Sequence, residues 1–386
     1  MRKFYTAEAV TEGHPDKLCD QIADAILDVC LKQDEQSRVA CEVLATKGTI
    51  IVAGEITSTY EPDVFAVVRK VLSDVGYSSE GIAMDTFVHR QSPDIAGAVD
   101  TSKERREGVS DNQMDWFQGA GDQGVMIGYA CDETKQLMPM PVVLANRIVR
   151  ELSACRQSSY IQGILPDGKA QVTVEYENGK PVRLDSVVVS CQHTEDKNLK
   201  KLEAEIRKKV LLPALRLLPP DEDTKILINP SGRFVCGGMD ADTGLTGRKL
   251  MVDSYGSMVP HGGGAFSGKD CSKVDRSAAY MARYIAKNIV AARLASRCQV
   301  SLAYAIGVAQ PVMVQVDTFG TGKVCADDCL ELAIPLVFGL TPKQIVDSLR
   351  LTRPIFRQTA AFGHFGRKEF PWERTDKVEA LRNAVI

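Results

Sequence analysis

The sequence lacks the features that mark several large protein classes. No apolar run approaches the roughly 20 residues of a membrane span. A net charge of −3 excludes a globally basic nucleic-acid binder and leaves open only a local basic patch. The N-terminal residues Met-Arg-Lys-Phe-Tyr-Thr-Ala-Glu contain no apolar signal core. We therefore expect a cytoplasmic protein that binds neither membrane nor nucleic acid.

Patterns for zinc sites, disulfides and covalent catalysis are also absent. The eleven cysteines are odd in number and include no Cys-x-x-Cys pair, and the pair Cys325 and Cys329 has no second pair or histidines nearby. The five histidines are far apart in the sequence. We predict reduced, mostly buried cysteines. Any metal is expected to be a hard cation bound by oxygens. No Ser/His/Asp or Cys/His order with a nucleophile elbow supports covalent catalysis.

What the chain does contain is a repeated order of helical and hairpin patterns. At 386 residues, 44% apolar and 25% charged, it has the composition of a globular protein of two or three domains. Helical patterns begin near residues 17, 141 and 273, and each precedes a hairpin pattern and further helices. We predict an α+β fold of three similar domains in a pseudo-threefold arrangement, each a β-sheet covered on one face by helices.

The predicted domains are residues 1–100, 119–228 and 229–386, and the polar, charged stretch 101–118 is predicted to be a mobile loop and a candidate active-site lid. Strand pairs are expected near 39–46 and 49–57, 171–176 and 181–193, and 299–309 and 312–318. One long helix is expected over 195–217, a capping box at Ser272 and Asp275, and a helix cap at Thr341.

The most glycine-rich stretch, residues 260–276, runs directly into a helical pattern. Its glycines allow backbone N–H groups to approach a ligand, and the helix N-terminus attracts anions, so the stretch predicts a phosphate site. Residues 263–269 fit the first seven positions of a P-loop, but Asp270 stands where a P-loop needs a Ser or Thr.

Ionisable residues also cluster at the other glycine turns. Basic groups that suit an anion and acids that suit Mg²⁺ together indicate a polyphosphate bound with its metals. Taken singly, each has an ordinary alternative: Pro166-Asp-Gly-Lys169 fits a surface turn, Glu55 an acid on a hairpin face, and Lys273 a solvated lysine of a first helical turn.

Four motifs resemble the S-adenosylmethionine synthetase (methionine adenosyltransferase) family, in matching order from residue 4 to about residue 375. They are Glu12-Gly-His-Pro-Asp-Lys17, Gly119-Ala-Gly-Asp-Gln-Gly124, Asp242-Thr-Gly-Leu-Thr-Gly-Arg-Lys249 and Gly262-Gly-Gly-Ala-Phe-Ser-Gly-Lys-Asp270. The resemblance implies that methionine sulfur attacks C5′ of ATP and expels triphosphate, which is then hydrolysed to pyrophosphate and phosphate. It also implies a homodimer with shared active sites, paired into a homotetramer.

The resemblance further implies roles for single residues, two Mg²⁺ ions per site and a K⁺ ion. His14, Lys169, Arg248, Lys269 and Asp122 would be catalytic. ATP would contact His14, Asp167, Lys169, Arg233, Phe234, Asp242, Arg248, Lys249, Ala265 and Lys269. Methionine would contact Glu55, Gln91, Asp242 and Lys273. Asp16 and Asp275 would bind Mg²⁺ and Glu42 would bind K⁺.

Two departures from the family pattern stand out. The loop between Gln91-Ser-Pro-Asp94 and Gly119 is about ten residues longer than usual and more charged, which puts the closing of the active site in question. Met239 replaces the usual proline, which questions local rigidity. Two other functions stay open: a P-loop-like phosphotransferase, which would transfer only the γ-phosphate, and a non-catalytic ATP-binding regulatory subunit, which would not turn ATP over.

Overall fold

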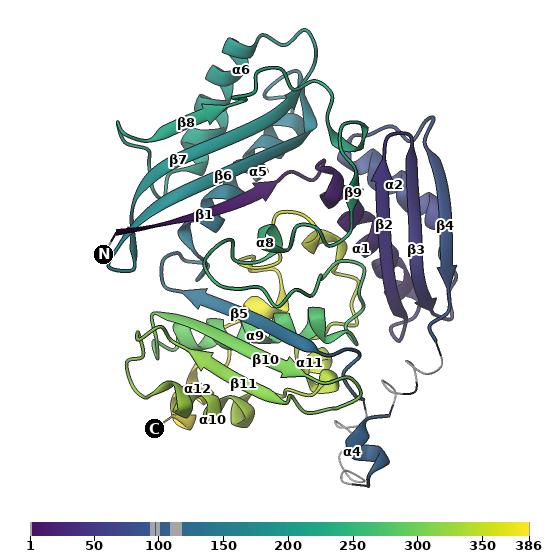
Figure 1. The fold of residues 1–386 in the computed structure, drawn as a ribbon, viewed down its shortest axis with the longest axis vertical. Helices are drawn as coiled ribbons and strands as arrows, with labels where there is room; N and C mark the ends of the chain where they lie inside the picture. Colours follow the sequence, from purple (N-terminus) through teal and green to yellow (C-terminus); the bar gives the residue numbers. More distant parts are fainter. Residues whose placement is uncertain (1, 93–96, 98–100, 109–117, 386) are drawn as a thin grey trace.

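The computed structural model describes residues 2–92, 97, 101–108 and 118–385. The chain forms three separate β-sheets with helices packed on them (Figure 1). Helix α1 (Pro15–Gln33) packs against β2 and β9 of one sheet and against the C-terminal turn Arg357–Thr359. The predicted α+β architecture of three domains is confirmed.

The first sheet has the strand order β4-β3-β2-β9. β2 (Arg38–Thr46) and β3 (Thr49–Thr57) form the predicted antiparallel hairpin, β4 (Ala83–His89) pairs parallel to β3, and β9 (Gly244–Leu245) pairs with β2. Helices α1 and α2 (Val64–Val75) cover it; α2 buries a stripe of valines and one leucine. Glu42 and Glu55 lie on the strands, as the alternation predicts.

The second sheet has the order β1-β6-β7-β8. It comprises β1 (Arg2–Val10), β6 (Ile164–Glu177), β7 (Lys180–His193) and β8 (Lys225–Ile228). The turn between β6 and β7 places Asn178 and Gly179 at positive φ, which Asn-Gly tolerates well.

Helix α5 (Met140–Gln157) packs on this sheet, together with a helical segment after β7. The single helix predicted over 195–217 is wrong in detail: α6 (Leu199–Ile206) passes through a π-turn, Arg207–Leu211, into α7 (Leu212–Ala214). Pro213 has no backbone N–H, so a regular helix cannot continue through it without losing a hydrogen bond.

The third sheet has the order β11-β10-β5, with β5 (Gly124–Cys131), β10 (Arg297–Tyr304) and β11 (Met313–Asp317). Its helices are α9 (Val274–Ala291), α10 (Asp327–Val337), α11 (Pro342–Leu349) and α12 (Val378–Ala384). The cap at Thr341 is confirmed as a capping box with Gln344. The capping box at Ser272 and Asp275 is wrong, because Lys273 is the N-cap of α9 and makes no side-chain cap hydrogen bond.

Each sheet recruits a strand from a distant part of the chain. β1 pairs with β6 from Arg2↔Glu177 to Val10↔Lys169, β5 joins β10, and β9 joins β2. β1 has no counterpart among the predicted strands. The boundaries 1–100, 119–228 and 229–386 therefore remain a proposal for units of sequence, because strand pairing crosses them.

The predicted mobile loop, 101–118, lies partly outside the described residues. Within 101–108 a single turn, α4 (Lys103–Arg106), is capped by Ser102. The Glu104 carboxylate accepts hydrogen bonds from the N–H groups of Ala309 and Gln310 at 2.9 to 3.2 Å. The described part of the loop is therefore attached to the segment between β10 and β11.

Among the described helices, none is by itself long and apolar enough to cross a membrane, and α10 and α11 reach that composition only as a pair bent by 75°.

Candidate active site

Four aspartates line one side of α1 at every fourth position. The carboxylate of each accepts backbone N–H groups of a segment that is distant in the sequence. Residues four apart lie on the same face of a helix. The carboxylates of Asp16 and Asp20 accept the N–H groups of Leu245 and Gly247 at 3.0 and 2.9 Å, and Asp28 accepts those of Phe356 and Arg357, both at 2.9 Å. Helix α1 thereby fixes the loop 242–249 and the C-terminal segment on one side.

The fourth aspartate of this row, Asp24, fixes the glycine-rich loop. Its carboxylate accepts the Gly268 N–H at 2.9 Å and forms a bidentate pair with Arg276 at 2.6 and 2.7 Å, and both side chains are fully buried. Gly268 has φ +78°, and a Cβ there would lie 1.9 Å from the Cys41 carbonyl oxygen. Only glycine lets the loop approach β2 this closely.

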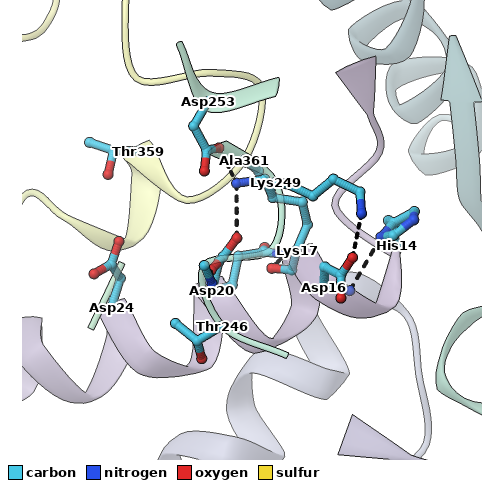
Figure 2. A network of polar contacts seen from close by, with 12 residues as sticks. His14, Asp16, Lys17, Asp20, Asp24, Thr246, Lys249, Asp253, Thr359 and Ala361 are labelled. Atoms are coloured by element: carbon cyan, nitrogen blue, oxygen red, sulfur yellow. Dashed lines mark hydrogen bonds and ion pairs between the residues drawn. The ribbon is translucent and has the colours of Figure 1, made fainter. Parts of the chain in front are cut away.

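Lys17 connects α1 to α8 (Leu250–Asp253) through buried charges (Figure 2). Its ammonium group, with no exposed area, donates to Asp20 at 3.0 Å and to Asp253. Burial raises the pKa of Asp253 to about 7, and Lys17 opposes this. Lys249 immediately precedes α8. The buried triad of Lys17, Asp20 and Asp253 therefore fixes the position of the Lys249 backbone.

His14 is the N-cap of α1 and lies among positive charges. Its Nδ1 accepts the Asp16 N–H at 3.2 Å, and only 2% of the residue is exposed. Burial, then Lys249 and Lys169, lowers the pKa of His14 to about 3. The imidazole is therefore neutral near pH 7, and because Nδ1 accepts a hydrogen bond, Nε2 carries the proton and can donate.

Asp16 is paired with the two basic residues at the end of the loop 242–249. Its carboxylate contacts the Lys249 ammonium (Figure 2), and the Arg248 guanidinium lies 3.7 Å from it. Although burial alone would raise it, hydrogen bonds from Lys249 and the Leu245 N–H lower the pKa of Asp16. The first group of site residues therefore comprises His14, Asp16, Arg248, Lys249 and the nearby Lys169.

Asp167 extends this group at one end of β6. Its Oδ2 accepts the Gly238 N–H at 2.8 Å, whereas its Oδ1 is buried and has no hydrogen-bond partner among the described residues. Burial raises the pKa of Asp167. A buried acceptor without a donor is costly, so Oδ1 is suited to a donor brought by a ligand.

The second group is built on the glycine-rich loop and the start of α9. Lys269 donates to Asp275 at 2.5 Å, and a Cβ on Gly264 would lie 2.4 Å from Asp275 Oδ1. Lys273 pairs with Asp270, whose carboxylate also accepts the Val39 N–H at 2.7 Å. Asp270, at the position where the P-loop pattern fails, thus attaches the loop to β2.

The remaining predicted residues lie on the strands and turns around this second group. Burial raises the pKa of Glu42, and Lys269 opposes the shift. Glu55 lies 3.1 Å from the His89 ring, and the Gln91 N–H donates to Thr57 at 3.2 Å. Asp122 is exposed and accepts the Gln123 N–H at 2.7 Å.

Three predicted ATP contacts lie on exposed or half-buried loop positions. Arg233 pairs with Glu195 at 2.7 Å, Phe234 N–H donates to the His193 ring at 3.1 Å, and Asp242 is exposed. Ala265 faces Gly247, and a Cβ added to Gly247 would lie 2.6 Å from the Cβ of Ala265.

The chain brings the predicted residues together in two groups rather than one. Across residues 2–92, 97, 101–108 and 118–385, no hydrogen bond or ion pair joins His14, Asp16, Asp167, Arg248 or Lys249 to Glu55, Lys269, Lys273 or Asp275. The glycine loop and the loop 242–249 pack against each other at Gly247 and Ala265.

The acidic residues do not form a preassembled metal site. In the part of the chain that the structure describes, no three His, Cys, Asp or Glu side chains converge as metal ligands. Asp16 and Asp275 belong to no such cluster among the described residues; Asp16 pairs with Lys249 and Asp275 with Lys269. Mg²⁺ is commonly held by one or two carboxylates together with substrate phosphates, so these single carboxylates fit a metal that arrives with a polyphosphate.

Sequence reasoning missed the residues that hold the loops in place: Lys17, Asp20, Asp24, Asp28, Asp253 and Arg276. A signal for three of them, Asp20, Asp24 and Asp28, existed. Acids at every fourth position of a helix whose other residues are also buried have to find internal partners.

Comparisons with known proteins place the whole chain beside one family. Residues 2–98, 117–234 and 236–374 match the family descriptions "S-adenosylmethionine synthetase" N-terminal domain, central domain and C-terminal domain, respectively. Proteins named S-adenosylmethionine synthase from Desulforudis audaxviator, Treponema denticola and a Nocardioides species are 52%, 50% and 53% identical. Each alignment covers 99% of this chain and 98 to 99% of the relative.

Proposed function

The chain belongs to the S-adenosylmethionine synthetase family and makes S-adenosylmethionine from ATP and L-methionine, and we propose that its two groups of charged residues bind the triphosphate of ATP as the leaving group. The methionine sulfur forms a bond to C5′ while the bond from C5′ to the triphosphate oxygen breaks. A thioether has no proton to lose, so this step needs no general base. It needs alignment of sulfur with C5′ and stabilisation of the charge on the triphosphate.

His14 is the residue whose surroundings support this proposal most directly. Held neutral among lysines, it offers an Nε2–H to the oxygen that leaves C5′, without giving up a proton at neutral pH. Lys169, Arg248 and Lys249 come from the same region and would contact the phosphates. Lys269 would do so from the glycine loop.

The ion pairs of the ligand-free chain suggest how the triphosphate is accepted. Without ligand, Asp16 forms an ion pair with Lys249, and Asp275 forms one with Lys269. When phosphate oxygens bind, the two lysines would contact the phosphates instead, and the two carboxylates would be free to bind cations. The family is metal-dependent; we propose two Mg²⁺ ions, at Asp16 and Asp275, and a K⁺ ion at Glu42. The cations would neutralise the triphosphate as its charge grows.

The rest of the predicted site divides between nucleoside and amino acid. Asp167 offers an unpaired buried oxygen to a hydroxyl or amino donor of adenosine. Arg233, Phe234 and Ala265 would surround the adenosine. Glu55, Gln91, Asp242 and Lys273 would bind the charged ends of methionine. Asp122 adds negative charge near the start of α9, where Gly121 packs against Ser272, and would act in catalysis with His14 and the basic residues.

We further propose a homodimer whose active sites are each completed by both chains, because no hydrogen bond or ion pair joins the two groups within the described residues of one chain. Pairing of dimers would give the homotetramer. The proposed location is the cytoplasm.

Product analysis tests the proposed reaction. Incubation with ATP, methionine, Mg²⁺ and K⁺ should yield S-adenosylmethionine, pyrophosphate and phosphate in equal amounts, with no ADP. The matched reaction without methionine should form no adenosyl product. Release of ADP would favour the phosphotransferase, and binding of ATP without turnover would favour the regulatory subunit.

A further inference from the structure

Only three of the eleven cysteines are accessible to solvent, and two of these are neighbours. Eight cysteines are buried; Cys236 and Cys329 are exposed, and Cys325 is half-buried. Cys236 lies on a separate loop, whereas Cys325 and Cys329 lie together at the start of α10.

The backbone around α10 presents the pair on the surface in a fixed way. Cys329 lies in the first turn of the helix, where its N–H bonds to the carbonyl of the N-cap Ala326 at 3.1 Å. Cys325 precedes that cap in non-helical backbone, and Cys329 lies close enough to it to raise the pKa of its thiol. Asp327 anchors the turn by accepting the Thr318 N–H at 3.0 Å and the Thr318 hydroxyl at 2.6 Å.

We propose that Cys325 and Cys329 form a redox-active dithiol that closes to an intramolecular disulfide by exchange with a low-molecular-weight disulfide such as glutathione disulfide. Residues four apart at a helix start have neighbouring side chains, and the non-helical Cys325 can approach without breaking a helical hydrogen bond.

The exchange proceeds in two balanced steps. The exposed Cys329 thiolate attacks one sulfur of glutathione disulfide, forming a mixed disulfide and releasing one glutathione thiolate. Cys325 then loses its proton and attacks the Cys329 sulfur, which expels the second glutathione thiolate. In total, two cysteine thiols are oxidised by two electrons, and one glutathione disulfide is reduced to two glutathione molecules.

The environment of Cys325 favours its role as the second nucleophile. Burial and then the adjacent Cys329 raise the pKa of the Cys325 thiol. Once Cys329 is in the mixed disulfide it can no longer carry a negative charge, so its contribution to this shift disappears and Cys325 ionises more readily.

The dithiol is separate from the proposed catalytic residues. Helix α10 packs on β11 and α12, and no described residue of the two site groups contacts Cys325 or Cys329 through a hydrogen bond or ion pair. The inference therefore does not depend on the proposed reaction, and neither thiol variant should change the basal rate of S-adenosylmethionine formation.

Peptide mapping of the full-length protein tests the proposal. The protein is equilibrated in glutathione buffers of increasing oxidised fraction, alkylated to trap free thiols and digested with trypsin. Cleavage after Lys323 and Lys343 places both cysteines in one peptide. We expect this peptide to lose two hydrogens and both alkylation sites, and to recover them on reduction with dithiothreitol.

Two variants complete the experiment. Cys329→Ser should abolish the linked peptide, whereas Cys236→Ser, which removes the isolated exposed thiol, should leave its yield unchanged. The proposal is overturned if Cys325 and Cys329 remain fully alkylated under conditions in which Cys236 has already formed a mixed disulfide. It is equally overturned if both cysteines stop at separate mixed disulfides with glutathione.

Discussion

At the scale of single residues, the site depends on groups whose charge is set by their neighbours. His14 stays neutral because burial and two lysines oppose its protonation, while Asp16 stays charged because Lys249 and a backbone N–H stabilise its anion. A neutral donor and a charged acid can thus lie two residues apart at one helix N-terminus. This division suits a reaction that develops charge on phosphate without proton transfer.

Lys269→Ala should slow the reaction strongly with little loss of stability. The ammonium group is half-exposed and supplies a fixed charge to the leaving triphosphate, so we expect a fall in kcat of roughly 10² to 10³-fold, as for the loss of one donor to a developing oxyanion. Steady-state kinetics measure this, with Lys180→Ala, an exposed lysine at the start of β7, as the control. A near-normal kcat would show that the glycine loop does not hold the triphosphate.

Asp28 should make folding stability depend on pH. Burial raises its pKa to about 6, although the hydrogen bonds from the N–H groups of Arg357 and Phe356 oppose this shift. The native state therefore binds the proton of Asp28 more tightly than the unfolded chain does. The resulting stabilisation is present below pH ~4 and is lost as pH rises through ~6, by up to about 3 kcal/mol for a shift of two units. Urea unfolding of the wild type and Asp28→Asn between pH 4 and 7 measures the difference. Parallel pH curves for the two proteins would contradict the assignment.

At the scale of elements, α1 is the support on which the loops of the site are mounted. Its row of aspartates binds loop backbone, which fixes loop position independently of loop side chains. The side chains of the loops remain available for ligands. The row of aspartates on α1 is therefore the part of the fold that places two glycine-rich segments beside the first sheet.

Asp24→Asn should destabilise the protein far more than loss of a surface ion pair. It leaves the fully buried Arg276 without its charged partner, which costs about 3–5 kcal/mol. Chemical unfolding should show this loss, and hydrogen exchange should increase at Gly268 and its neighbours. Lys343→Ala, which removes the exposed pair with Asp347, is the control and should cost at most ~0.5 kcal/mol. Equal losses for the two variants would contradict this account.

Local patterns predicted the elements whose partners are near in sequence. The hairpin of β2 and β3 depends on local alternation, and the cap at Thr341 accepts an N–H only three residues away, so both were found. β1 was missed because its partner β6 lies more than 150 residues away. The capping box at Ser272 failed because the Ser272 N–H is already bonded to Asp270.

The candidate site was predictable as a set of residues but not as an arrangement. Glycine turns with ionisable residues marked the chemistry, and family motifs assigned roles to positions. The partners of those positions in the free chain, such as Lys249 for Asp16, are set by which loops meet. That depends on the buried contacts of α1, which no local pattern encodes.

At the scale of the whole molecule, the proposed homodimer would bring the two groups of site residues together in one active site. Within the described residues of one chain, no hydrogen bond or ion pair joins the proposed phosphate-binding residues near His14 to those on the glycine loop, although the proposed reaction would need both groups for one triphosphate. A second copy that offers its glycine loop to the first chain's His14 group would resolve this, and two-fold symmetry would then build two equal sites.

Mixing two inactive variants tests this arrangement. His14→Asn and Lys269→Ala each disable one group, so each homodimer should be nearly inactive. After unfolding and refolding together, half of the dimers should be mixed, each with one intact site and one doubly altered site. Activity should therefore recover to about a quarter of the wild type. No recovery, although mixed dimers are present by mass spectrometry, would show that each site is built within one chain.

The exchange of strands between sheets has a consequence for how the chain folds. β1 precedes β6 by more than 150 residues, yet its whole length pairs with β6, so its hydrogen bonds cannot form before residues 164–177 have been made. β2 likewise lacks β9, and β5 lacks β10, until much later parts of the chain are made. Folding is therefore dominated by distant pairings, which are slow to form, and the nascent N-terminal part keeps unpaired strand edges meanwhile. β9 and β10, which pair with β2 and β5, both lie beyond Thr243, so the first and third sheets are completed only after that part of the chain has been made.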